Sequence, residues 1–115
     1  MREKIKDKGR LEHILESIEF IIDFTKGIDF EDFKTDMKLR FAIIKNLEII
    51  GEASYMLSNE FREQHTNVPW RKLINLRHVL VHGYYQIKLE IIWEIIQKDL
   101  LSLNEQIQTL YNNEI

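Results

Sequence analysis

The chain has 115 residues, of which 44% are apolar and 30% are charged, a composition typical of one globular domain spanning residues 1–115. It has no cysteine, four glycines and one proline, which excludes disulfides, thiolate metal sites and cysteine nucleophiles, and argues against a turn-rich all-β fold. The formal net charge of −3 creates no global field that attracts nucleic acid, so RNA binding requires a local basic site.

The N-terminal segment MREKIKDKGRLEH is charged throughout and lacks the apolar core of a signal peptide. No apolar run approaches the ~20 residues of a membrane span. We therefore expect a cytoplasmic protein with no membrane contact, in agreement with its lack of cysteine.

The first predicted helix carries apolar residues at three- and four-residue steps, which form a wide apolar face. These residues are Leu11, Ile14, Leu15, Ile18, Ile21 and Ile22. Lys26 and Gly27 predict a cationic last turn followed by a terminating glycine. Phe30 and Phe33 are expected in a short acidic connector.

A second helix is expected to begin near Thr35 or Asp36, either of which can cap it. Its predicted inner stripe comprises Phe41, Ile44, Leu47, Ile50, Ser54 and Leu57. Gly51 and Ala53 are small enough to let another helix come close. The mostly polar residues 59–67 predict a short helix or a loop.

Two further helices complete the predicted fold. Pro69 suits the first turn of a third helix, where its missing N–H costs nothing, and Gly83 suits its end or a kink. The predicted buried side of this helix is formed by Leu73, Leu76, Leu80 and Val81. The last helix is predicted from about Lys88 to Tyr111, with a seam of Leu89, Ile92, Ile96, Leu100, Leu103, Ile107 and Leu110. With no strand alternation, the sequence predicts an all-α antiparallel bundle of four to five helices.

The residues whose side chains could take part in catalysis are concentrated in the segment 68–85, VPWRKLINLRHVLVHGYY. Within it, Arg77, His82 and Tyr84 form the pattern R-x4-H-x-Y, which resembles the motif of the HEPN superfamily, specifically the HepT-like ribonuclease toxins. The flanking segments KNLEIIGEASYMLS (45–58) and IIWEIIQKDL (91–100) also resemble that family, in the same order. The resemblance covers most of the chain from about residue 37 onward.

This resemblance implies a dimeric helical bundle that cleaves RNA without a metal at the dimer cleft. It also implies a partner, a minimal nucleotidyltransferase antitoxin, which can neutralise the toxin by adding AMP to the motif tyrosine, here Tyr84. Two positions depart from the family pattern: His78 stands where a small polar residue such as asparagine is usual, and Lys88 stands where an acidic residue often opens the last helix.

Metal-free RNA cleavage needs a base for the 2′-hydroxyl, an acid for the leaving 5′-oxygen and a cation for the developing phosphorane charge. Histidine can serve as acid or base near neutral pH, and arginine grips phosphate with two parallel hydrogen bonds. Arg77 and His82 are therefore the predicted catalytic residues, with His78, Asn75 and Tyr84 as auxiliary or RNA-binding residues. No cofactor is expected.

Helix geometry constrains this site. Residues five apart lie about 140° apart around a helix, whereas residues seven apart nearly coincide. Arg77 is thus expected to share a face with Tyr84, while His82 lies with His78 on another edge that Asn75 extends. Two copies related by a twofold axis could bring Arg77 and His82 to one phosphate, which favours a homodimer.

Other interpretations remain open. His78 and His82, four residues apart, could bind zinc, but the lack of cysteine and of a nearby carboxylate in a ligand pattern favours a metal-free site. As alternatives to a ribonuclease toxin, the chain could be a non-catalytic nucleotide- or RNA-binding helical module. It could also be a structural partner of a nucleotidyltransferase, inactivated by the change at His78.

Overall fold

The computed structural model describes residues 2–113, apart from the side chains of residues 2–4 and 84. Its helices are α1 (Arg2–Phe24), α2 (Phe30–Thr35), α3 (Met37–Met56), α4 (Asn59–Gln64), α5 (Trp70–Gly83), α6 (Leu89–Lys98) and α7 (Leu100–Asn113), with the 3-10 turn η1 (Tyr84–Gln86). Residues 2–113 contain no strand, so the predicted all-α class is confirmed. None of these helices has the length and apolar character needed to cross a membrane.

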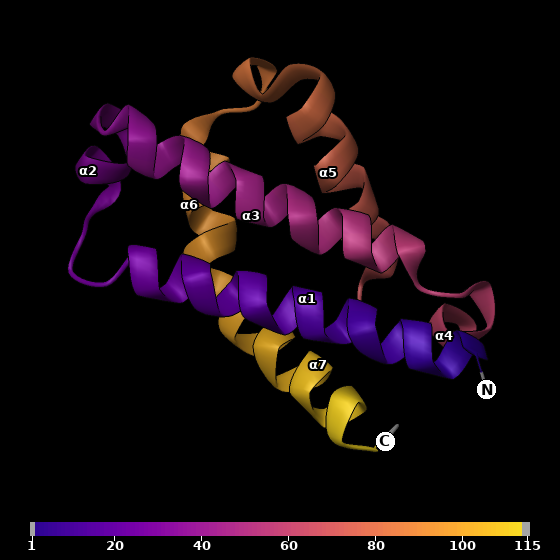
Figure 1. Ribbon diagram of the computed structural model, residues 1–115. Coiled ribbons are helices and arrows are strands. Elements are labelled where there is room, and N and C mark those ends of the chain that lie inside the picture. Colours follow the sequence, from indigo (N-terminus) through magenta and orange to yellow (C-terminus); the bar gives the residue numbers. More distant parts are fainter. Residues whose placement is uncertain (1, 114–115) are drawn as a thin grey trace.

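The long helix α3 is the centre of the fold. It packs against α1 on one side and against α5 on the other, and α7 lies along α1 (Figure 1). The predicted stripes of α1 and of the C-terminal helices form the core, including Leu11, Ile14, Ile18, Ile21, Ile92, Ile96, Leu100, Leu103, Ile107 and Leu110. Burial of this continuous apolar surface is the main force that holds the helices together.

The four main helices were predicted, but two boundaries were wrong. The connector after Gly27 contains the short helix α2, because Asp29 and Asp32 form a reciprocal capping box at its start. The predicted single C-terminal helix is divided into α6 and α7 at Asp99, whose φ of −101° differs from the usual helical value while its ψ of −28° stays in the right-handed α region. Aspartate is a poor residue for a helix interior, since its side chain competes for backbone hydrogen bonds.

Helix ends follow the predicted chemistry at most positions. Asp36 caps α3 by accepting a hydrogen bond from the backbone N–H of Leu39 at 3.1 Å, which confirms one of the two predicted caps. Gly27 adopts a left-handed φ of 71°, as expected for a glycine that ends a helix. Lys26 lies beyond the last residue of α1, so the predicted cationic last turn was wrong.

Two residues assigned to buried stripes are exposed. Phe41 is 43% exposed and lies under the guanidinium of Arg40, 5.6 Å from the ring centroid, so it is not part of the α3 core. Val81 is 44% exposed, because Leu80 takes the core position on α5 and the next residue is rotated by about 100°. In both helices the predicted set of buried residues included one residue too many.

The junction between α3 and α4 is fixed by a buried carboxylate. Asp7 of α1 accepts hydrogen bonds from the backbone N–H of Ser58 at 2.8 Å and from its hydroxyl at 2.7 Å. The Ser58 hydroxyl also accepts from the N–H of Phe61 at 3.2 Å and thereby caps α4. The indole of Trp70 donates to the carbonyl of His65 at 2.9 Å, which ties the start of α5 to the end of α4.

Candidate functional site

The position of Arg77 is set by the close crossing of α3 and α5. A Cβ atom at Gly51 would overlap the Cβ of Arg77 and lie 2.6 Å from the carbonyl oxygen of Leu73. Only glycine allows this approach. The expectation that Gly51 lets another helix come close is therefore confirmed, and the helix in question is the one that carries the motif arginine.

Arg77 forms an ion pair with the residue next to that glycine. Its Nε lies 3.0 Å from Oε2 of Glu52, and the two side chains are 36% and 49% exposed. A carboxylate held at Nε leaves the edge formed by the two terminal amino groups available for a phosphate. Glu52 thus orients the guanidinium without occupying its whole hydrogen-bonding surface.

A small hollow of about 310 Å³ lies beside this ion pair, between α3 and α5. Its lining includes Lys45, Glu48, Glu52, Arg77 and Val81. Nζ of Lys45 lies 4.0 Å from Oε1 of Glu48. With Arg77 and Glu52, the hollow is therefore lined by two cations and two carboxylates. The exposed Val81 is explained by its place in this wall.

The two histidines of α5 lie together on the solvent side of the helix. The ring centroids of His78 and His82 are 4.6 Å apart, and both side chains are exposed. Asn75 is exposed one turn earlier, at the spacing that extends the same edge. Arg77 turns instead toward α3, where it meets Glu52. The structure therefore brings the two histidines together and places Arg77 on a different side of α5.

The structure does not test two further predictions about this site. The side chain of Tyr84, the predicted acceptor of AMP, lies outside the described residues. For metals, no group of three histidine, aspartate or glutamate side chains in the described part of the chain is arranged to hold an ion. The sequence did not predict a role for Glu52. A signal was present beside it, because glycine lowers the stability of a helix interior and Gly51 therefore indicated a close contact at this point.

Comparison with known proteins shows the family to which the chain belongs. Residues 14–110 match the Ribonuclease HepT-like family. A protein of Caldanaerobacter subterraneus subsp. tengcongensis, named "Putative RNase", is 45% identical over 90% of this chain and 93% of its own length. A Thermococcus cleftensis protein named "Probable ribonuclease HepT" is 41% identical over 93% of this chain and 97% of its own. No solved structure gives a significant match.

The fold and the comparisons define the class: an all-helical protein related to ribonucleases. The chain belongs to the Ribonuclease HepT-like family, as its R-x4-H-x-Y motif predicts. This membership supports ribonuclease activity.

Replacing Gly51 with alanine is expected to lower the free energy of unfolding by about 1–3 kcal/mol, because the added methyl forces α3 and α5 apart. Chemical denaturation measures the change. Gly9→Ala is the matched control, since a Cβ at Gly9 of α1 meets nothing within 4 Å. That control should gain up to about 1 kcal/mol from helix propensity. Equal stability of the Gly51 variant and the wild type would show that the crossing is not tight.

Proposed function

We propose that this protein is a metal-independent endoribonuclease that acts as the toxin of a toxin–antitoxin pair in the cytoplasm. The observation that carries the proposal is the constellation on α5. Arg77 is held at Nε by Glu52 with its terminal amino groups available, and the exposed pair His78 and His82 lies on the neighbouring face of the same helix. Family membership supports RNA as the substrate.

In the proposed reaction, a base removes the proton from a ribose 2′-hydroxyl, and that oxygen attacks the adjacent phosphorus. The bond to the 5′-oxygen breaks, and an acid donates a proton to the departing oxygen. The products are a 2′,3′-cyclic phosphate and a free 5′-hydroxyl. His82 acts as acid or base, and Arg77 stabilises the charge that develops on the phosphorane oxygens.

The proposed active unit is a homodimer. Arg77 and His82 point to different sides of α5, and a twofold pairing of two α5 helices would combine groups from both copies at one phosphate. Exposed apolar residues beside the histidines, Val79 at 41% and Val81 at 44%, support an interface there. Light scattering at micromolar concentration tests this, and a 13.9 kDa monomer would contradict it.

The proposed partner is a minimal nucleotidyltransferase antitoxin, and the proposed point of control is Tyr84. A phosphate-bearing group on the Tyr84 hydroxyl would compete with RNA for the guanidinium of Arg77. Mass spectrometry after co-expression with the partner tests this. Complete neutralisation with Tyr84 unmodified would show that inhibition works by binding alone.

Incubation of the purified protein with total RNA, with and without EDTA, tests the ribonuclease proposal. We expect cleavage that persists in EDTA and leaves cyclic phosphate ends. Cleavage abolished by EDTA and restored by a divalent ion would contradict a metal-independent reaction. RNA that is bound but left intact would instead support a non-catalytic binding module.

A further inference from the structure

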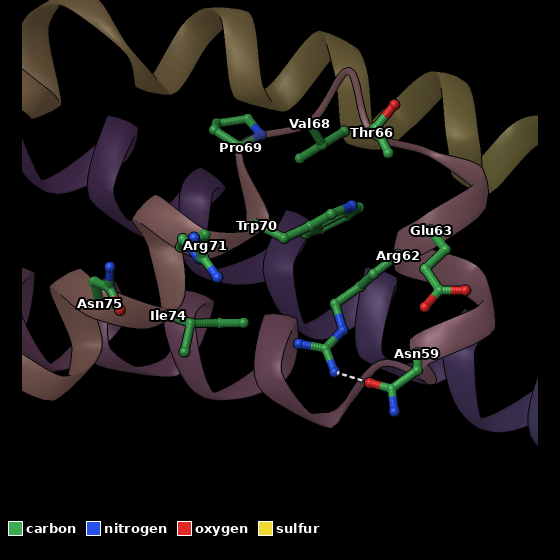
Figure 2. Close-up of a pocket in the computed structure, with 10 residues that line it drawn as sticks. All are labelled: Asn59, Arg62, Glu63, Thr66, Val68, Pro69, Trp70, Arg71, Ile74 and Asn75. Atoms are coloured by element: carbon green, nitrogen blue, oxygen red, sulfur yellow. Dashed lines mark hydrogen bonds between the residues drawn. The ribbon is translucent and has the colours of Figure 1, made fainter.

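A second hollow lies between α4 and the first turns of α5, where Asn75 begins the edge that carries the two histidines. It has a volume of about 680 Å³, within the range of ligand-binding clefts. Figure 2 shows Arg62 of α4 on one side, Arg71 and Ile74 of α5 on the other, and the indole of Trp70 between them. Trp70 is only 6% exposed and is tied to the carbonyl of His65, so this wall is rigid.

The hollow has the local basic character that binding to nucleic acid requires of a chain with a net negative charge. Two guanidinium groups, those of Arg62 and Arg71, face it, and a hydrogen bond to Asn59 holds the first of them in place (Figure 2). Among the described residues that line it, Glu63 alone is acidic, and it lies at the opposite end from Asn75. Arginine side chains neutralise and hydrogen-bond the phosphates of a nucleic-acid backbone.

The hollow is continuous with the proposed catalytic edge. Arg71, Asn75, His78 and His82 follow spacings of four, three and four residues, which places them in one exposed stripe along α5. The stripe is about 16 Å long, at ~1.5 Å per residue. At most about five stacked nucleotides, at ~3.4 Å each, cover this length, and fewer do so in an extended strand. A strand cleaved at His82 and laid along α5 therefore reaches Arg71.

We infer that this hollow is a binding subsite for single-stranded RNA, a few nucleotides from the cleaved linkage. The inference rests on the proposed ribonuclease function and adds a substrate requirement to it. Arg71 and Arg62 contact the phosphates, while the amide of Asn75 and the amide nitrogen of Asn59 are available to base edges. A flexible single strand can follow the bend from the stripe into the groove. Substrates that extend into the groove are thus preferred over short ones.

The linkage that the protein cleaves is first mapped on total RNA. The test then compares cleavage of this linkage in a single-stranded RNA of about twelve nucleotides and in a trinucleotide. The wild type is expected to prefer the longer substrate in kcat/KM. Arg71→Ala should reduce this preference about 5- to 10-fold and lower the salt slope of binding to the labelled 12-mer by about one. Arg71→Lys should restore the slope. Lys26→Ala, in the turn that follows α1, is the charge-matched control. The C-terminal end of α1 and α4 lie at opposite ends of the molecule (Figure 1).

Fluorescence anisotropy with the 12-mer separates this inference from the function on which it rests. Binding that depends on Arg71 without any cleavage would refute the ribonuclease and support the subsite. Cleavage with an unchanged length preference in Arg71→Ala would overturn the subsite and leave the ribonuclease standing. A changed oligomeric state in that variant would also overturn it, since the groove would then be an interface between protein chains. Circular dichroism verifies that the variants are folded.

Discussion

Replacing His82 with alanine is expected to reduce the rate of RNA cleavage by about 10²–10⁴-fold, the usual cost of losing a general acid or base. The same change should alter the free energy of unfolding by no more than ~1 kcal/mol, because the side chain is exposed and its ring contacts the exposed His78. Single-turnover cleavage and chemical denaturation on the same preparation separate the two effects.

Two histidine controls sharpen this result. His78→Ala should show a smaller loss than His82→Ala, because position 78 is where the chain departs from the family pattern. His13→Ala, an exposed histidine on α1, should cleave at the wild-type rate. A His82→Ala protein that cleaves RNA at nearly the wild-type rate, or one that fails to fold, would show that His82 is not catalytic.

The helices were predictable because their periodicity is a local property of the sequence. The apolar seam of α7 and the cap at Asp36 could both be read from spacing and residue type. Boundaries that depend on competition between neighbours were less predictable. Asp99 could have been tolerated in one long helix, and only packing shows that the helix divides there. Likewise, the exposure of Phe41 depends on which helices cover the start of α3.

The candidate site was predictable along one helix but not between helices. Spacing alone placed His78 and His82 on a common edge, as the structure shows. The ion pair between Arg77 and Glu52 joins residues 25 positions apart, so it depends on how α3 and α5 cross. Gly51 indicated that another helix comes close, but the sequence did not show that Arg77 is the residue at the contact. Similarly, the arginine-flanked groove exists because α4 folds back beside α5.

Replacing Arg77 with alanine is expected to lower the rate of cleavage by about 10²–10³-fold, the range found when a donor to a developing oxyanion is removed. Arg77→Lys keeps the charge but loses the planar pair of donors, so it should recover only part of this loss. Arg40→Ala is the matched control, since Arg40 lies over Phe41 on α3. Cleavage at the wild-type rate by Arg77→Ala would show that the guanidinium takes no part in the reaction.

The role of Glu52 follows from the same experiment. Glu52→Gln keeps the shape of the side chain but removes the charge that holds Nε of Arg77. We expect a loss of about 10-fold in cleavage rate, smaller than that of Arg77→Ala. If Glu52 acts by orienting the guanidinium, its replacement should have no further effect once Arg77 is alanine, a non-additivity that a double-mutant cycle measures. Equal losses in both backgrounds would show that Glu52 acts independently of Arg77.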